Sequence, residues 1–195
     1  VADVLRKGGW NLITVDLRAT GIYSVKGDQI GRAPDHNSAE WAMWTGRPLL
    51  GQWTYDVVRV LDVLGDQKPV VIGDGPAGLV ALSVSALAGE RTGGVVAMNT
   101  MASYITHVPY ENQRLGTLTP GILRDVGDVA HLAAIGRAPR TVIVGGVNGK
   151  GQSLDFLELT TTYAPAVQKG RLVGEPSRIV LLEWSDSAGM LKALE

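Results

Sequence analysis

The segment VVIGDGPAGLVAL, residues 70–82, decides the fold, because it joins a short apolar run to an apolar helix through a glycine turn. Val70–Ile72 has the β-branched residues of a buried strand, Gly73–Gly78 is expected to turn tightly, and Leu79–Ala88 is almost wholly apolar. An apolar helix of this kind is typical of one that lies beneath a sheet. The segment therefore predicts a strand–turn–helix unit of an α/β fold.

Further apolar runs extend this pattern along the chain. We expect strands near residues 11–16, 70–73, 95–98, 141–145 and 179–183, and helices near 53–64, 78–88, 122–135 and 153–163. Continuous apolar strands separated by helices predict a mostly parallel sheet with helices on both faces. Residues 17–52 are rich in Gly and Pro and are expected to form a long loop. The length favours one domain over residues 1–195.

Composition excludes several classes of function. The chain has 18 basic and 19 acidic residues, a balance that argues against a nucleic-acid binder. It has no Cys, which excludes disulfides, thiol nucleophiles and Cys-based zinc sites. His36, His107 and His131 are too widely spaced to predict a metal site, and no apolar stretch has the roughly 20 residues of a membrane-spanning helix. We expect no metal, no cofactor and no membrane contact, and the compartment stays open.

The glycine turn has the spacing G-x-G-x-x-G, with Gly73, Gly75 and Gly78. This spacing is the fingerprint of dinucleotide binding, in which a helix N-terminus meets the pyrophosphate. The fingerprint also needs an acidic residue at the end of the next strand to hold a ribose hydroxyl. That strand is followed by Asn99 and Thr100. A dinucleotide-binding oxidoreductase therefore stays an alternative that lacks one of its required residues.

The same geometry serves the nucleophile turn of α/β-hydrolases, where a Ser flanked by small residues projects from the top of the sheet. In this register Gly75 stands at the nucleophile position, between Gly73 and Ala77. Upstream, GGWNLITVDLRATG (residues 8–21) looks like the hydrolase segment in which a strand ends in a D-x-R-G-x-G-like turn, with Ala19 replacing the usual Gly.

Three segments make the resemblance more specific: GRPLLGQWTYDVVRVLDVL (46–64), VVIGDGPAGLVAL (70–82) and NTMASY (99–104). They resemble acetyl-xylan-esterase-like proteins of the α/β-hydrolase superfamily, in the version found in long bacterial proteins. The resemblance implies the C-terminal portion of the fold, with the N-terminal strands and the oxyanion loop before Val1. The chain is then expected to be a fragment of a longer protein, and a secreted or periplasmic location is compatible with the family.

The triad that the resemblance implies is not filled. Acyl transfer on this fold uses Ser, an acid and a His in that chain order. Gly75 has no side chain, and Asn148 stands at the aligned acid position. No His follows His131, although the base should follow the last strand. We interpret this as a degenerate triad. Other polar or loop residues near the expected strand ends are candidates for a pocket: Asp74, Pro76, Ser103, His107, Ser185 and Asp186.

These observations lead to one main hypothesis and two alternatives. The main one is a non-catalytic hydrolase-like domain that is structural or binds a carbohydrate or acyl-ester ligand. The first alternative is an active carbohydrate or carboxylic esterase, with a relocated site such as Ser103 and His107 or with its catalytic residues elsewhere in the parent chain. The second is the dinucleotide-binding enzyme. A truncated sheet would leave an open edge, so the missing N-terminal segment or another chain is the expected partner there.

Overall fold

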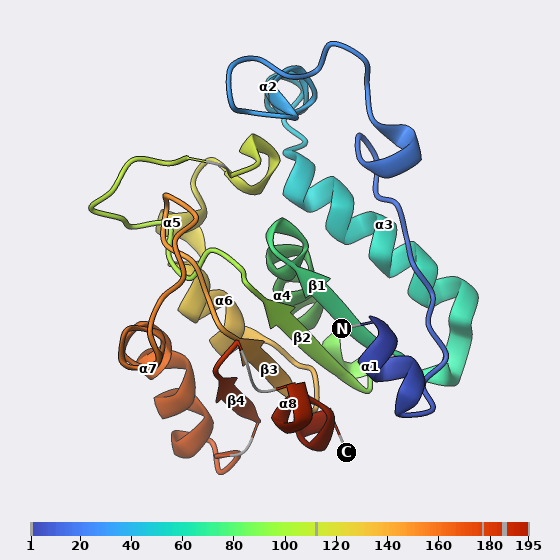
Figure 1. Cartoon of the computed structure of the whole chain (residues 1–195), viewed down its shortest axis with the longest axis vertical. Helices are drawn as coiled ribbons and strands as arrows, with labels where there is room; N and C mark the ends of the chain where they lie inside the picture. Colours follow the sequence, from blue (N-terminus) through green and yellow to red (C-terminus); the bar gives the residue numbers. More distant parts are fainter. Residues whose placement is uncertain (1, 112, 177, 185–186, 195) are drawn as a thin grey trace.

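A parallel four-stranded sheet forms the centre of the computed structural model, which describes residues 2–111, 113–176, 178–184 and 187–194. The strands follow each other in sequence order across the sheet: β1 (Val70–Asp74), β2 (Gly94–Met98), β3 (Thr141–Val144) and β4 (Ile179–Leu182) (Figure 1). The register places Val71 beside Val95, Val95 beside Thr141, and Thr141 beside Ile179. All four carboxyl ends therefore meet at one edge of the sheet.

Helices connect the strands and cover both faces of the sheet (Figure 1). They are α1 (Ala2–Lys7), α2 (His36–Trp44), α3 (Leu49–Leu64), α4 (Pro76–Ala88), α5 (Ile122–Asp125), α6 (Val129–Ile135), α7 (Phe156–Leu172) and α8 (Ser187–Leu194). None of the described helices is long and apolar enough to span a membrane. The expected α/β architecture, with a parallel sheet between helices, is confirmed.

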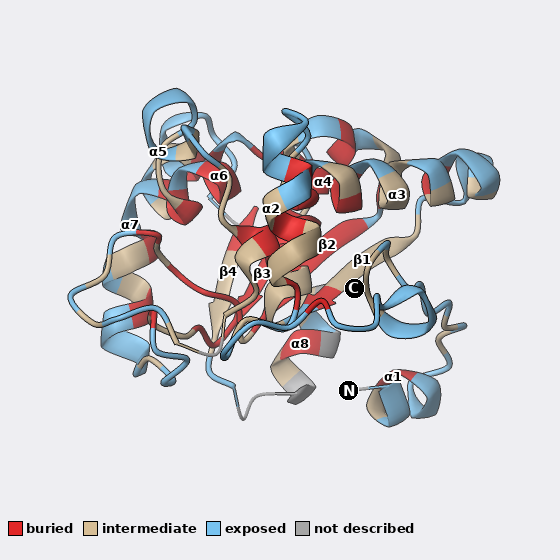
Figure 2. Ribbon diagram, turned by 90° about the horizontal axis from the view of Figure 1, so that it is seen from above, coloured by how far each residue is buried: buried red, intermediate tan, exposed pale blue. Residues whose placement is uncertain are grey.

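The two faces of the sheet bury different helices, because alternate residues of a strand point to opposite sides. Val96 and Val142 share one apolar cluster with Leu5 of α1 and Met190 of α8. Ala97 and Ile143 face the other way, into the larger cluster built with α3, α4, α6 and α7. Figure 2 shows this core as the buried strands and the helix surfaces turned toward them.

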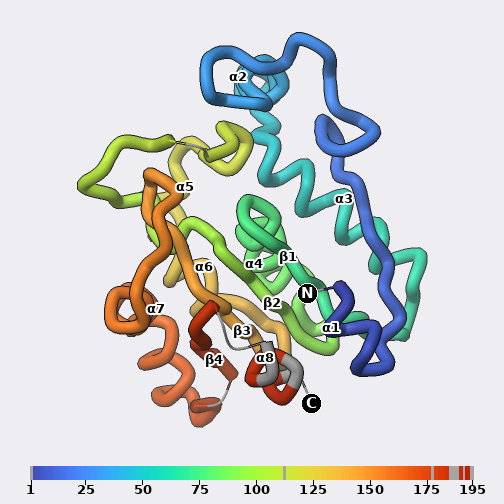
Figure 3. Tube along the Cα trace, viewed as in Figure 1, coloured from blue at the N-terminus to red at the C-terminus, as the bar shows by residue number. Residues whose placement is uncertain are grey.

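The strand expected over residues 11–16 is wrong. These residues make no backbone hydrogen bond within the described chain, so they have no ladder partner. The segment runs extended beside α3 (Figure 3), and Arg18, just after it, is held by side chains of that helix. Trp53 Nε1 donates to Arg18 O at 2.8 Å, and Arg18 Nε donates to an Asp56 oxygen at 2.8 Å. A strand needs a neighbouring strand for its main-chain groups, and β-forming residues alone do not supply one.

Other boundaries also differ from expectation. The helix expected over 122–135 is two helices, because Gly127 has φ 103° and Asp128 begins a new helix as its N-cap. The helix expected over 153–163 begins after Asp155 and continues to residue 172, through Pro165. The loop expected over 17–52 contains α2 and the first turn of α3. Burial of Ala39 and Ala42 against the rest of the core explains why this Gly-rich segment is helical.

Candidate functional site

The turn between β1 and α4 has the sharp geometry that the sequence predicts. Gly75 is its central residue, with φ 57° and ψ −125°, a conformation that L-residues rarely adopt. Its N–H donates to Met98 O at 2.8 Å, which ties the turn to the end of β2. Pro76 follows at the first turn of α4, where its missing N–H costs no helical hydrogen bond. The strand-to-helix turn at residues 73–78 is therefore confirmed.

Close packing explains two of the three glycines in the turn. A Cβ on Gly73 would lie 2.1 Å from the backbone oxygen of Ala77, and one on Gly78 would lie 1.6 Å from Thr100 Oγ1. Gly75 differs, because a Cβ there would meet no atom within 4 Å. A side chain at residue 75 would thus face open space.

Residues after β2 brace this turn from the side. Asn99 Nδ2 donates to Asp74 Oδ1 at 3.1 Å, and Thr100 Oγ1 donates to Gly75 O at 2.9 Å. Asp74 is exposed at the end of β1. Asn99 and Thr100 occupy the place where a dinucleotide site would have its ribose-binding acid, and they bond to the turn itself.

Asn148 lies in the loop after β3 and organises that loop. Its Oδ1 accepts hydrogen bonds from Lys150 N at 2.9 Å and Gln152 N at 3.1 Å, while its Nδ2 donates to Gln152 Oε1 at 3.1 Å. All of these contacts close a turn of five residues, so this amide is occupied by its own loop.

Ser103 forms a hydrogen bond with a carboxylate. Its hydroxyl lies within hydrogen-bond distance of two acceptors, Asp128 Oδ2 and Ile105 O, and no hydrogen bond links it to His107. His107 is exposed and has no hydrogen-bond partner among the described residues. The structure thus connects Ser103 to Asp128, a residue that sequence reasoning did not single out.

Asp128 is the centre of this polar cluster and the N-cap of α6. Its Oδ1 accepts from Tyr104 N at 2.7 Å and Val129 N at 2.8 Å, and its own N–H donates to His131 Nδ1 at 3.1 Å. The sequence feature that could have identified Asp128 is the spacing Asp-x-x-His before an apolar run, which is the pattern of a capping box. In a catalytic triad the His lies between Ser and the acid. Here the acid contacts Ser103 directly, so His131 is not placed as its base.

Three tyrosines feel the charge of Asp128, and each has a raised pKa. Burial raises the pKa of Tyr104, Tyr110 and Tyr163, and the negative charge of Asp128 adds to the effect in all three. Tyr104 and Tyr110 use their hydroxyls as donors to Thr117 O and Tyr104 O. The hydroxyl of Tyr163 is fully buried and has no hydrogen-bond partner in the described structure. All three side chains are therefore neutral near neutral pH.

A hollow of about 420 Å³ lies at the carboxyl ends of β3 and β4. Its lining combines two aromatic rings, two acids and small or aliphatic residues: Phe156, Trp184, Asp155, Glu183, Gly145, Leu154 and Leu159. Trp184 is 51% exposed and Phe156 is 43% exposed. A Cβ on Gly145 would lie 3.3 Å from Trp184 Cβ and 3.7 Å from Asn99 Oδ1, so the hollow adjoins the residues that brace the glycine turn. Ser185 and Asp186 lie outside the described residues.

The two acids in this hollow differ in whether their carboxylates are already engaged. Asp155 caps α7, because its carboxylate accepts from Glu158 N at 2.8 Å. Glu183 is exposed and makes no ion pair within the described part of the chain. No group of three His, Asp or Glu side chains suited to a metal ion occurs among the described residues. The hollow is thus an aromatic, weakly acidic surface with one free carboxylate.

Comparisons with known proteins point to the same architecture. No protein-family model matches the sequence, and no curated protein does. A solved structure that is similar is a carbohydrate esterase family 15 (CE15) glucuronoyl esterase from Caldicellulosiruptor kristjansonii, with a TM-score of 0.53 and 17% identity. The similarity covers 74% of this chain and 48% of the esterase, so the chain matches about half of that structure. The protein therefore has an α/β-hydrolase-like fold that is similar to the fold of a carbohydrate esterase.

Proposed function

We propose that this chain is an esterase-like α/β domain that binds a carbohydrate without cleaving it. Gly75 carries the proposal: the sequence aligns it with a hydrolase nucleophile, and it has a strained backbone conformation, no side chain and open space above it. Fold alone assigns no activity, because activity depends on the residues of the site.

The neighbouring polar residues support the absence of acyl transfer. That reaction needs a nucleophile, a base within hydrogen-bond reach and a group that orients the base. The Ser103 hydroxyl donates to Asp128, and the Asn148 amide is used by its own loop. His107 has no partner that would orient its ring among the described residues. Among the described residues, an ester bound at this edge would meet no activated nucleophile.

The hollow beside β4 supports carbohydrate as the ligand class. Its volume of about 420 Å³ lies in the range of small-molecule sites, roughly 300–1,000 Å³. Trp184 and Phe156 offer exposed rings on which the apolar faces of sugar rings can pack. Glu183 offers carboxylate oxygens that accept hydrogen bonds from sugar hydroxyls. We choose a xylan-type oligosaccharide, free or acetylated, as the carbohydrate to test, because the sequence resembles acetyl-xylan-esterase-like proteins.

Calorimetric titration with xylotetraose and with its acetylated form tests this proposal. We expect saturable binding of at least one form, with the acetyl groups intact afterwards. Trp184→Ala should weaken binding by about tenfold or more, which corresponds to about 1.4 kcal/mol. Trp44→Ala is the matched control, since Trp44 is 73% exposed on α2 and outside the hollow. Equal binding by both variants, or no binding at all, would refute the ligand site.

Turnover separates this proposal from the active-esterase alternative. We expect no saturable hydrolysis of short acyl esters by the chain, and only slow hydrolysis by Gly75→Ser combined with Asn148→Asp, because that variant still lacks a His base. Hydrolysis by the wild-type chain that is lost in Ser103→Ala or His107→Ala would show a working enzyme with a relocated nucleophile.

A further inference from the structure

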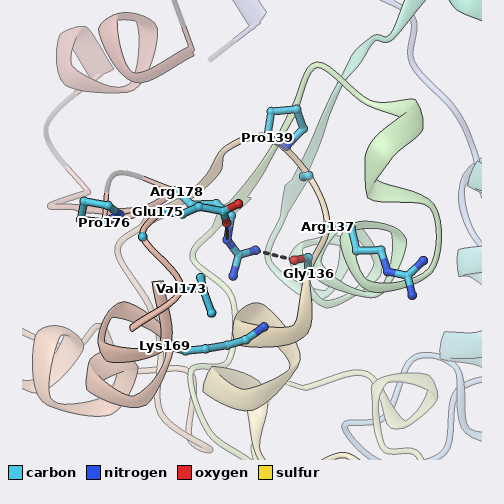
Figure 4. Close-up of a pocket in the computed structure, with 10 residues that line it drawn as sticks. Gly136, Arg137, Pro139, Lys169, Val173, Glu175, Pro176 and Arg178 are labelled. Atoms are coloured by element: carbon cyan, nitrogen blue, oxygen red, sulfur yellow. Dashed lines mark hydrogen bonds and ion pairs between the residues drawn. The ribbon is translucent and has the colours of Figure 1, made fainter. Parts of the chain in front are cut away.

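A second hollow lies at the opposite edge of the sheet, beside the amino ends of β3 and β4. It has a volume of about 590 Å³ and lies between the loop over 136–139 and the residues 173–176 and 178 (Figure 4). Because β3 and β4 are parallel, their amino ends are separated from the glycine turn by the length of the strands. The proposed carbohydrate site and this hollow therefore do not overlap.

Two cationic side chains converge at this hollow. Lys169 Nζ donates to Ala134 O at 2.7 Å, and Arg178 NH2 donates to the same oxygen at 2.8 Å. A second guanidinium nitrogen of Arg178 donates to Gly136 O, the contact drawn as a dashed line in Figure 4. Arg178 is buried, with 8% of its surface exposed. Two positive charges thus lie within hydrogen-bond reach of one carbonyl oxygen.

Capping of α6 explains part of this arrangement. Cations are favourable at a helix C-terminus, where carbonyl groups lack intrahelical partners. It does not explain Arg178 Nε, which is buried and donates no hydrogen bond. Glu175 Oε2 is 3.1 Å from Nε, close enough for an ion pair but outside hydrogen-bond geometry. The Glu175 side chain is 59% exposed, so a solvent-facing carboxylate stands beside a buried donor.

We propose that this hollow binds a small oxyanion, the carboxylate or phosphate group of a metabolite. The oxyanion would take the place of Glu175 beside Arg178 Nε and would balance the second charge on Lys169. Charge-assisted bonds between a guanidinium and an oxyanion are among the strongest hydrogen bonds in proteins. Arg137 also lines the hollow, with its side chain directed away from the other two cations in Figure 4, and adds positive charge at the rim.

Titration of the 195-residue chain with inorganic phosphate and, separately, with succinate tests the proposal. Amide ¹H–¹⁵N spectra report the site, with sodium chloride of equal ionic strength as the control for screening. We expect saturable chemical-shift changes at residues 136–138 and 173–175. The anion that binds with the lower Kd identifies the ligand class. Lys169→Met should weaken binding, and Lys169→Arg should retain it, because Arg preserves the charge.

Glu175→Gln provides the sharper test, because it removes the carboxylate that competes with the ligand. We expect on the order of fivefold tighter binding, because the Glu175 carboxylate is exposed to solvent and therefore competes only weakly for Arg178. Glu40→Gln on α2, a helix that lies far from α7 and β4 in Figure 1, changes the net charge equally and should leave binding unchanged. Shifts that do not saturate, or that Lys169→Met and Glu175→Gln leave unaltered, would overturn the proposal. Equal tightening by Glu40→Gln would also overturn it, since net charge would then explain the effect.

Discussion

Substitution of the glycines in the turn after β1 should separate steric from conformational demands. Gly73→Ala places a methyl group 2.1 Å from the backbone oxygen of Ala77, so α4 must move away from β1. Overpacking of this kind against backbone is expected to cost about 3 kcal/mol or more. Gly75→Ala meets no atom within 4 Å and costs only backbone strain, about 1–3 kcal/mol, at φ 57°. Reduced entropy of the unfolded chain offsets about 0.4–1 kcal/mol of that strain.

Urea unfolding followed by far-ultraviolet circular dichroism measures these differences. The expected order of stability is Gly51→Ala, then wild type, then Gly75→Ala, then Gly73→Ala. Gly51 is the matched control, because it lies within α3 with open space around it and with no left-handed φ. Alanine there should stabilise the helix by roughly 0.5–1 kcal/mol. If Gly73→Ala proved as stable as Gly75→Ala, the close approach of α4 to β1 would be refuted, and with it the placement of residue 75.

Four further predictions concern buried polar groups and ligands. Tyr163→Phe removes a buried hydroxyl that has no hydrogen-bond partner in the described structure. The free energy of unfolding in urea should therefore stay equal or rise by about 1 kcal/mol. A decrease of that size would show that the hydroxyl does have a partner. Burial raises the pKa of Tyr104 and Tyr163 above their values in the unfolded chain. Their contribution to stability is therefore full below about pH 10 and falls as pH rises further, by up to about 1.4 kcal/mol per pH unit for each tyrosine. Between pH 8 and 11, the free energy of unfolding should fall less steeply with pH for Tyr163→Phe than for the wild type. Asp35→Asn should cost about 1–3 kcal/mol, because the buried carboxylate accepts from Leu115 N and Gly116 N and the amide offers only one acceptor atom. Flavin and nicotinamide dinucleotides should leave the melting temperature unchanged, whereas a true ligand at about 100 times its Kd would add about 2.7 kcal/mol and would revive the dinucleotide alternative.

The similarity to a carbohydrate esterase bears on the fold of the chain, whereas the residues of the turn after β1 bear on its chemistry. The similarity concerns the course of the chain, at 17% identity, and shows the fold alone. The turn concerns chemistry: Gly75, which the sequence aligns with a hydrolase nucleophile, has no side chain and stands at the sharp turn before α4. The binding proposal follows from the combination, since a scaffold that presents loops at the carboxyl edge of its sheet can hold a ligand without reacting with it.

Local sequence by itself determined the strands of the sheet, the turn at 73–78 and the lack of a side chain at residue 75. These features depend on neighbours in the chain: apolar runs make buried strands, and glycine permits the left-handed turn. The same local signals were misleading at residues 11–16, which are rich in β-forming residues but have no neighbouring strand to bond. They also missed the break at Gly127, where a positive φ separates two helices.

Only the tertiary structure decided which polar groups meet. Ser103 bonds to Asp128, twenty-five residues away, and Arg178 reaches Ala134 O and Gly136 O across more than forty residues. No periodicity or spacing encodes such contacts, because they depend on how α6 and the segment before β4 pack against each other. Burial then sets their chemistry, since a guanidinium withdrawn from water must find acceptors within the fold. The vacancy at Gly75 could be read from the chain, whereas the cationic hollow beneath β3 and β4 exists only once these elements are assembled.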